Sequence, residues 1–251
     1  MTSPEISPEA SPRKVVVLPG GAWRVDPRKA LAVSALCWLG FAVLVWLVTT
    51  NRTGTLDQTG LLFWRTGDGL GPRGPKFLLE GVRDLTSLGG VLLRNLIAAG
   101  AVAALLFLKL RREAILLTLT VIGGWLVDFA VKTLVGRPRP LIVPHLTEAG
   151  GASFPSGHAF NSAVVYIAIA LAFATMSARE SVRYTIIGIA VALSLVVAWT
   201  RVWLGVHFPS DVAAGWLGGA GWAFLAAALL SRPAQKAADS KTAHKMDPTE
   251  A

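Results

Sequence analysis

The sequence predicts an all-α membrane protein with six transmembrane helices in a bundle. Of its 251 residues, 53% are hydrophobic and only 16% are charged, and the mean hydropathy is +0.55. Soluble domains usually carry about 25% charged residues, so this composition excludes a soluble fold. Cys37 is the single cysteine, which excludes a fold held by disulfides. Six apolar stretches reach the roughly 20 residues that a helix needs to cross a bilayer. They are residues 29–49, 88–108, 113–135, 157–177, 183–203 and 209–231.

Two polar segments flank these stretches. Residues 1–28 hold Pro, Ser and scattered charges, and residues 232–251 have a similar composition. Such segments bury too little apolar surface to fold, so we expect two disordered cytoplasmic tails around one membrane domain, residues 29–231. The first stretch resembles a signal peptide, but it is too long and lacks a convincing small-residue cleavage site. We therefore expect it to remain as the first span.

The segment between the first two stretches, residues 50–87, is too long to be a simple turn. Glycine and proline residues break regular structure between positions 69 and 75. Residues 76–86 have the pattern of a short amphipathic helix lying on the membrane surface, and an ordered loop is equally compatible with them. The residues expected on the inward face of this helix are Phe77, Leu78, Val82 and Leu85.

The placement of lysine and arginine predicts the orientation in the membrane. The formal net charge is +9 and the pI is about 10.3, which raises the question of a nucleic-acid partner. The basic residues are spread between apolar stretches, however, so no nucleic acid is expected. With the N-terminus inside, the inner segments carry 14 Lys and Arg residues and the outer segments carry seven. Because cytoplasmic segments are the more basic ones, we expect both termini in the cytoplasm.

Six charged or histidine side chains are expected to meet at one end of the bundle. The third stretch ends near Lys132, since Gly136 and Pro138 stop a helix. Two full spans separate His158 from Arg201, and two helices of about 20 residues bring the chain back to the same face. With the N-terminus inside, this face is the outer one. The six residues are Lys132, Arg139, His158, Arg201, His207 and Asp211.

The cations of this set suit a phosphoryl group. Lys132, Arg139 and Arg201 would neutralise its oxygens, and an arginine can do so with two parallel hydrogen bonds. Ser156 and Gly157 open the fourth stretch as a helix cap and a point of close backbone approach. Free N–H groups at this helix start, aided by the helix dipole, are a second anion-binding device.

His207 and Asp211 have the spacing of a nucleophile and its partner. Residues four apart lie on one face of a helix. A carboxylate bonded to one ring nitrogen fixes the tautomer and leaves the other nitrogen basic, as a histidine nucleophile requires. In-line displacement places the attacking and leaving groups on opposite sides of phosphorus. We therefore expect His158 to face the leaving oxygen and protonate it.

Three motifs in this region resemble one family. Residues 132–140 read Lys-x6-Arg-Pro, residues 155–158 read Pro-Ser-Gly-His, and residues 201–211 read Arg-x5-His-x3-Asp. Together, and in this order, they are similar to the signature of the type-2 phosphatidic acid phosphatase superfamily. That group includes bacterial lipid phosphatases, glucose-6-phosphatase and vanadium haloperoxidases. Thr200 departs from the serine that the family usually has before the arginine, but it keeps a hydroxyl.

The resemblance implies a metal-independent phosphatase with a phosphohistidine intermediate and no cofactor. His207 is then the nucleophile, Asp211 orients it, and His158 is the general acid. The residues implied to hold the phosphate are Lys132, Arg139, Ser156, Gly157 and Arg201. Independently of the resemblance, no cluster of Asp, Glu and His in the sequence has the spacing of a dedicated metal site.

Three further charges lie close to these motifs. Asp128 is one helical turn before Lys132, so we expect the two to pair in a supporting structural role. Arg137 is expected either to touch the substrate or to lie at the surface. Arg94, several residues into the second stretch, either reaches a lipid headgroup or extends to the membrane interface.

We therefore expect a lipid-phosphate phosphatase of a bacterial inner membrane, with its site facing the periplasm. Its substrate would be a phosphomonoester or pyrophosphate lipid. The sequence does not choose among undecaprenyl pyrophosphate, phosphatidylglycerol phosphate, phosphatidic acid and a lipid A phosphate, and it leaves the oligomeric state open. A lipid phosphotransferase with the same site is one alternative. A transporter of a phosphorylated solute is another, although transporter sites usually lie near the membrane midplane within internal repeats.

Overall fold

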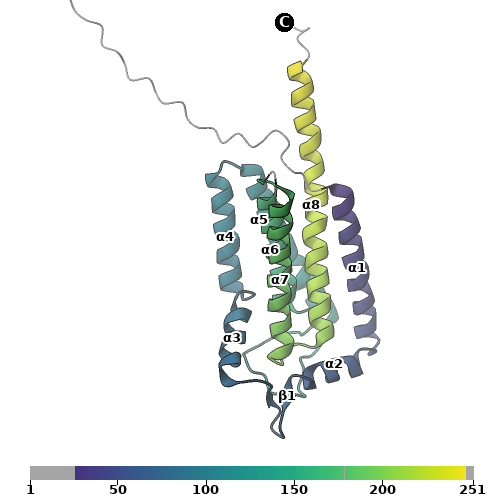
Figure 1. Cartoon of the computed structure of the whole chain (residues 1–251). Coiled ribbons are helices and arrows are strands. Elements are labelled where there is room, and N and C mark those ends of the chain that lie inside the picture. The colour runs from purple at the N-terminus through teal and green to yellow at the C-terminus, as the bar shows by residue number, and fades with distance from the viewer. Residues whose placement is uncertain (1–25, 178, 247–251) are drawn as a thin grey trace, which may run out of the picture.

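The predicted all-α membrane architecture is confirmed. The structure is a computed structural model that describes residues 26–177 and 179–246. Its long helices run side by side, and a short hairpin lies at one end of the bundle (Figure 1). The helices are α1 (Pro27–Thr49), α2 (Gly54–Leu62), α3 (Lys76–Ser87), α4 (Val91–Phe107), α5 (Arg111–Val135), α6 (Gly157–Ala174), α7 (Glu180–Trp203) and α8 (Pro209–Met246). The strands β1 (Arg65–Thr66) and β2 (Gly71–Pro72) pair antiparallel.

The second of the six expected spans is a broken helix. Within the described residues, α1, α5, α6, α7 and α8 are each long and apolar enough to cross a bilayer. The helix α4 has only 17 residues, which is too short by the same measure. Joined to α3, from which it is bent by 47°, it is long enough to cross the bilayer. Gly89 and Gly90 stand at the bend, and glycines are common at sharp kinks.

The short amphipathic helix predicted between the first two spans is present as α3. Its Val82 is fully buried, and Leu78 packs on a cluster from the end of α7. Phe77 and Leu85 do not pack into the bundle, since their side chains are 74% and 38% exposed, and their expected position facing the membrane stays a prediction. The buried face of α3 is turned so that Thr86 reaches the bundle instead.

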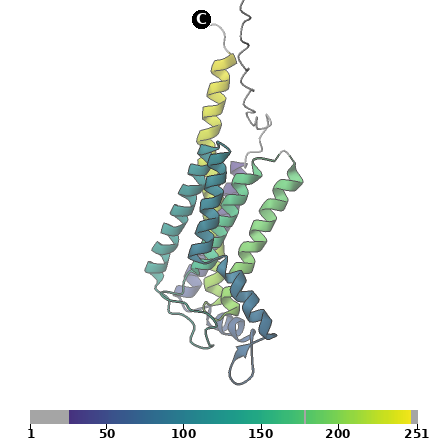
Figure 2. The same ribbon diagram turned by 90° about the vertical axis from the view of Figure 1, so that its left-hand side faces the viewer.

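Other differences concern the loop after α1 and the two tails. The helix α2 and the β1–β2 hairpin were not predicted, because α2 has two glycines and no clear apolar periodicity. Residues 27–28 open α1, and residues 232–246 continue α8 as helix rather than forming a disordered tail. The far part of α8 extends beyond the bundle at the end opposite α2 (Figures 1 and 2). Residues 1–25 and 247–251 of the expected tails lie outside the described residues.

The helix α6 is the centre of the bundle, and α8 packs directly against it. Most of α6 is buried, and its neighbours include α5, α7 and α8. A Cβ atom at Gly215 of α8 would lie 2.6 Å from the carbonyl oxygen of Ser156, and one at Gly219 would lie 2.1 Å from that of Phe160. Small residues let helix backbones approach closely in membranes. The first turns of α6 and α8 are therefore held side by side.

Candidate active site

The structure brings the predicted site residues together at the end of the bundle that holds α2 and the hairpin. There α5 and α7 end and α6 and α8 begin, as the two views show (Figures 1 and 2). The charge of Arg139 is close enough to act on both Lys132 and Arg201. The residues contributed by these helix ends and by the loop 136–156 are Lys132, Arg139, Ser156, Gly157, His158, Arg201, His207 and Asp211.

Ser153 mediates the pairing of His207 with Asp211. Nδ1 of His207 lies 3.7 Å from Oδ2 of Asp211, which is too far for a direct hydrogen bond. The hydroxyl of Ser153 donates to that carboxylate oxygen at 2.5 Å and lies 3.3 Å from Nδ1. The predicted pair of carboxylate and imidazole is therefore present, but the hydroxyl of Ser153 links the two groups in place of a direct hydrogen bond. Ser153 was not predicted, because it precedes the Pro-Ser-Gly-His motif and carries no signal of its own.

Arg139 contacts the other nitrogen of the same ring. Its Nη1 lies 3.0 Å from Nε2 of His207. A guanidinium has N–H donors and no acceptor, so Nε2 must accept with its lone pair, and the proton of the neutral ring must be on Nδ1. Arg139 is itself held by the carbonyl oxygens of Gly150, Gly151 and Val206. The resulting tautomer is the one in which Nε2 is free to act as a nucleophile.

The environment of His207 keeps its ring neutral. The side chain is only 2% exposed. Burial lowers the pKa of His207 to about 4, and the positive charge of Arg139 acts in the same direction, while Asp211 partly opposes both. At neutral pH the imidazole is therefore unprotonated on Nε2 without any further proton transfer.

Arg137 is a partly buried bridge between two carboxylates, with its side chain 17% exposed, so it is not a surface residue, and contact with the substrate stays a prediction. Its Nη1 donates to Oδ1 of Asp211 at 2.6 Å, and its Nη2 donates to Oδ2 of Asp57 at 2.7 Å. Asp57, in α2, is 1% exposed and also accepts from the backbone N–H and the hydroxyl of Ser210. The guanidinium lies 4.2 Å from the centre of the Phe208 ring. The loop helix α2 is thereby connected to the carboxylate that faces His207.

Lys132 lies against the first turn of α6. Its Nζ donates to the carbonyl oxygen of Pro155 at 2.5 Å. A Cβ atom at Gly157 would lie 3.2 Å from Oδ2 of Asp128 and 3.8 Å from Nζ of Lys132, so glycine leaves space beside the ammonium group. Asp128 acts on Lys132 electrostatically, but its hydrogen bond comes from the amide of Asn161 at 3.0 Å. The supporting position expected for Asp128 is present, with Asn161 as its direct partner.

Ser156 occupies the N-cap position of α6, but its side chain makes no capping hydrogen bond. Its backbone N–H donates instead to the carbonyl oxygen of Asp211 at 3.0 Å. The hydroxyl is fully buried and, among the described residues, has no hydrogen-bond partner. A buried hydroxyl without a partner at the start of a helix is available to a bound anion.

Arg201 is positioned by α3. Its side chain is 3% exposed, and Nη1 donates to the hydroxyl of Thr86 at 2.8 Å, while Nε has no partner within the described part of the chain. The hydroxyl of Thr200 donates to the carbonyl oxygen of Val197 at 2.5 Å and lies 2.9 Å from that of Thr86, whose own proton is therefore the one shared between the two hydroxyls. The residue that replaces the usual serine therefore uses its hydroxyl to hold Thr86, which the sequence did not identify.

His158 lies in the first turn of α6, beside the bend between α3 and α4. A Cβ atom at Gly89 would lie 3.1 Å from Cδ2 of its ring. The ring is partly exposed and interacts electrostatically with His207 and Arg201. A partly exposed imidazole next to a cation-lined site is suited to exchange protons with a bound group.

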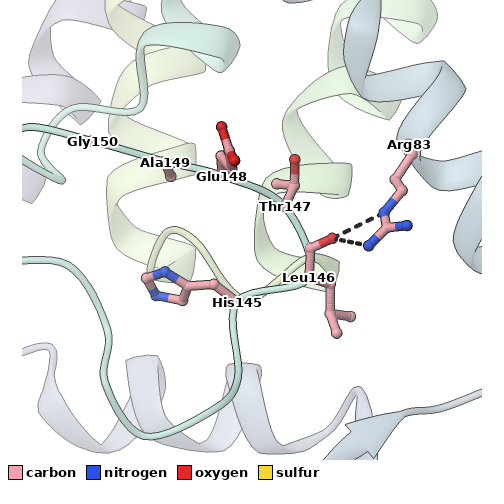
Figure 3. Close-up of a pocket in the computed structure, with 7 residues that line it drawn as sticks. All are labelled: Arg83, His145, Leu146, Thr147, Glu148, Ala149 and Gly150. Atoms are coloured by element: carbon pink, nitrogen blue, oxygen red, sulfur yellow. Dashed lines mark hydrogen bonds between the residues drawn. The ribbon is translucent and has the colours of Figure 1, made fainter.

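A surface cavity of about 670 Å³ borders the site. Figure 3 shows it between the loop of residues 145–150 and Arg83 of α3. The side chain of Arg83 donates twice to the carbonyl oxygen of Leu146, at 2.7 and 3.0 Å. Gly150, at one end of this loop, accepts from Arg139 at 2.7 Å. Through Gly150, the loop connects the wall of the cavity to the cation that contacts His207.

Comparison with known proteins agrees with this arrangement. Residues 112–234 match the PAP2 superfamily. Phosphatidylglycerophosphatase B of Bacillus subtilis is 32% identical over 145 residues, which are 55% of this chain and 68% of that protein. Lipid A 1-phosphatase of Rhizobium etli is 36% identical over 126 residues, 47% of this chain and 49% of that protein. The crystal structure of a transmembrane PAP2-type phosphatidylglycerolphosphate phosphatase from Bacillus subtilis superposes with a TM-score of 0.71. It has 25% identity and covers 81% of this chain and 96% of that one.

The fold, the site and these relatives define a multi-pass membrane phosphatase, a hydrolase of phosphoric esters. The chain belongs to the PAP2 superfamily. These findings favour the predicted enzyme over a transporter. The matched residues begin at 112, so α2, α3 and α4, with Asp57, Thr86 and Arg94, lie outside the matched segment.

Proposed function

We propose that this protein is a lipid-phosphate phosphatase that works through a phosphohistidine at His207. Its substrate is a phosphomonoester or diphosphate lipid, and its site faces the periplasm of a bacterial inner membrane. The observation that carries the proposal is the contact between Arg139 and Nε2 of His207, at 3.0 Å. It supports a neutral ring whose nucleophilic lone pair points at a guanidinium, the group that would hold a phosphate oxygen.

In the first step, Nε2 of His207 attacks phosphorus and the bond to the leaving oxygen breaks. His158 gives a proton to that oxygen as the lipid alcohol or lipid phosphate departs. The lone pair that accepts from Arg139 is the one that must reach phosphorus. Arg139 therefore exchanges His207 for a phosphate oxygen when the substrate binds, and joins Lys132 and Arg201 around the developing charge.

In the second step, water attacks the phosphohistidine and the bond between Nε2 and phosphorus breaks. His158, now unprotonated, accepts the proton of the attacking water, and inorganic phosphate leaves. Throughout both steps Nδ1 keeps its proton. Ser153 and Asp211 face that N–H, so they stabilise the positive charge that the ring carries while it is phosphorylated.

The lipid nature of the substrate is supported by the position of the site and by the relatives. The site lies where four membrane-spanning helices begin or end, which is the depth of lipid headgroups. Two of the relatives are named for phosphatidylglycerophosphate and lipid A substrates. The periplasmic orientation is supported by the excess of Lys and Arg in the segments at the other end of the bundle.

A phosphoenzyme assay tests the proposal. The purified protein should release phosphate from a lipid phosphate, and acid quench during turnover should trap radiolabel from the scissile phosphate on the protein. His207→Ala should trap none. His244→Ala, in α8 near its far end, is the matched control and should label like the wild type. Label on the His207→Ala protein would contradict the assignment, and transfer of phosphate to an added alcohol in place of water would identify a phosphotransferase.

A further inference from the structure

Arg94 is a buried cation that the reaction proposed above does not use. It lies in the first turn of α4, and its side chain is 5% exposed. Its Nη1 donates to the carbonyl oxygen of Gly89 at 3.2 Å, and its Nη2 reaches the side-chain oxygen of Asn95 only at 3.4 Å. Its Nε has no partner among the described residues. A buried charge with so few good hydrogen bonds is costly inside a membrane protein, and such charges mark functional sites.

A cavity of about 300 Å³ reaches this guanidinium from between α4, α5 and α6. Asn95 and Asn161 are polar residues of its wall, and Ile122 and Trp125 belong to its apolar part. The latter two side chains are 52% and 53% exposed, so the apolar part opens on the outer surface of α5. This division fits an amphiphile that places an anionic group at Arg94 and a hydrocarbon chain along the helix surface.

Arg94 lies on the His158 side of the site. Gly89 connects the two, because its carbonyl accepts from Arg94 and a Cβ at its position would lie 3.1 Å from the ring of His158. Arg94 also acts on His158 electrostatically. Since His158 faces the leaving oxygen in the proposed mechanism, Arg94 lies beside the leaving group. Arg201 and Arg139, which are assigned to the scissile phosphate, act on the same histidine, so the two proposed phosphate positions adjoin one another at His158.

The charge balance around Arg94 favours an anion. Asp128 interacts electrostatically with both Lys132 and Arg94, so two cations share this carboxylate. One of its oxygens, Oδ2, accepts from Asn161, which lines the same cavity. With Lys132 committed to the scissile phosphate, a second phosphate would supply the hydrogen-bond acceptors that Arg94 lacks.

We infer that Arg94 binds a second phosphate carried by the leaving group, and that the enzyme therefore prefers lipids with two phosphate groups. The inference rests on the proposed function and narrows its substrate class. Two kinds of lipid share this chemistry. The leaving group of a polyprenyl diphosphate is itself a phosphate, and that of phosphatidylglycerol phosphate carries a phosphodiester. Phosphatidic acid has a single phosphate and leaves the Arg94 position empty.

The test compares kcat/KM of the full-length protein on these three lipids. Arg94→Gln should lower the ratio of kcat/KM for a two-phosphate lipid to that for phosphatidic acid by roughly 10- to 100-fold, the loss expected for a hydrogen bond to a charged group. Arg94→Lys keeps the charge but not the planar fork, so its ratio should fall less. Arg52→Gln removes an exposed positive charge at the same end of the bundle and should leave the ratio unchanged.

The outcomes separate the inference from the function on which it rests. A lowered ratio for only one of the two-phosphate lipids supports the inference and identifies the source of the second phosphate. An equal fall of kcat/KM on all three lipids in both Arg94 variants would overturn it, because Arg94 would then act on folding or on the scissile group. If Arg94→Gln does not fold, Arg94→Lys decides alone. Failure of the wild type to release phosphate from any lipid would overturn the proposed function as well.

Discussion

One lone pair of His207 has two successive partners in the proposed cycle. Without substrate it accepts from Arg139, and during the reaction it forms the bond to phosphorus. The guanidinium thereby protects the nucleophile from protonation, since a proton on Nε2 would face a positive charge 3.0 Å away. The same residue then neutralises the phosphate that displaces it. Activation of the nucleophile and binding of the substrate are coupled through Arg139.

This coupling predicts the pH dependence of the reaction. Because the pKa of His207 is lowered to about 4, the ring stays neutral as the pH falls through its ordinary value of about 6.5, and the nucleophile is lost only near pH 4. Arg139→Gln removes a positive charge that lowers this pKa, so the acid limb of kcat/KM should move to higher pH while the rate falls. The measurement is the pH profile of both proteins. An acid limb that is unmoved in Arg139→Gln would contradict this account.

The sequence predicted the eight candidate site residues but not the residues that hold them in place. The eight site residues lie in short motifs, and their spacing relative to the spans is enough to place them at one end. Ser153, Asp57 and Thr86 act through contacts with residues far along the chain, since Asp57 is 80 residues from Arg137 and Thr86 is 115 from Arg201. No local pattern marks such a partner. Only the packed structure brings them to the site.

At the level of elements, two helices outside the matched family segment brace the site. The helix α2 holds Arg137 and the first turn of α8 through Asp57, and α3 holds Arg201 through Thr86. Gly60 of α2 allows this contact, because a Cβ there would lie 2.5 Å from the ring of Pro209. The segment between the first two spans therefore supports residues of the candidate site as well as connecting the spans.

The bracing by α2 predicts a positioning role for Asp57. In Asp57→Asn, Arg137 loses one of its two carboxylates, so Asp211 is held less well and kcat should fall about tenfold, with a smaller change in KM. Asp57→Glu should restore part of the rate. A double-mutant cycle with Arg137→Gln should show strong non-additivity, because the two residues act through one contact. Additive effects in that cycle would mean that Asp57 acts on stability alone.

The close contact of α6 and α8 predicts a sharp difference between two glycines. A Cβ at Gly219 would lie 2.1 Å from a backbone oxygen of α6, which cannot move without shifting the helix. Gly219→Ala should therefore destabilise the protein by roughly 1–3 kcal/mol. Gly188, in α7, has nothing within 4 Å of its Cβ position, so Gly188→Ala is the control and should be neutral or slightly stabilising. Thermal unfolding in detergent measures both. Equal unfolding temperatures would show that the helices separate without cost.

The spans themselves could be predicted because membrane insertion depends on length and apolarity, which the sequence shows directly. The break in the second span was not predicted, because 88–108 alone has the length and apolar content of a span despite Arg94 and Asn95. The bend arises where Gly89 and Gly90 allow α3 to turn onto α7. The continuation of α8 to Met246 was not predicted because this segment is polar. Its polar composition gives no burial signal, and Pro233 favours the end of a helix, yet α8 continues to Met246.

For the molecule as a whole, the site and the extended part of α8 lie at opposite ends (Figure 1). The proposed orientation puts the first in the periplasm and the second in the cytoplasm. Released phosphate then enters the periplasm, while the lipid product stays in the outer leaflet of the inner membrane. The direction of the bundle thus decides which compartment receives each product.

Two single cysteines test this orientation in a Cys37→Ser background. Asp68, at the exposed turn of the hairpin, lies at the site end, and Glu180, with a side chain 76% exposed, lies at the other. In intact cells whose outer membrane is permeable to the reagent, a membrane-impermeant maleimide should label Asp68→Cys. It should label Glu180→Cys only after the inner membrane is opened. The reverse pattern would place the active site in the cytoplasm.

The 47° bend between α3 and α4 determines how far apart two of the cations near the site lie. On one side of it Thr86 fixes Arg201, and on the other side Arg94 projects from α4, with Gly89 between them against His158. In the proposed mechanism, this angle sets the separation of Arg201, assigned to the scissile phosphate, from Arg94, assigned to the second phosphate. In a relative whose second span is straight, the two cations would lie at a different distance and would fit a lipid with a different spacing of its two phosphates. Selection among lipids would then depend on backbone geometry, with the reacting residues unchanged.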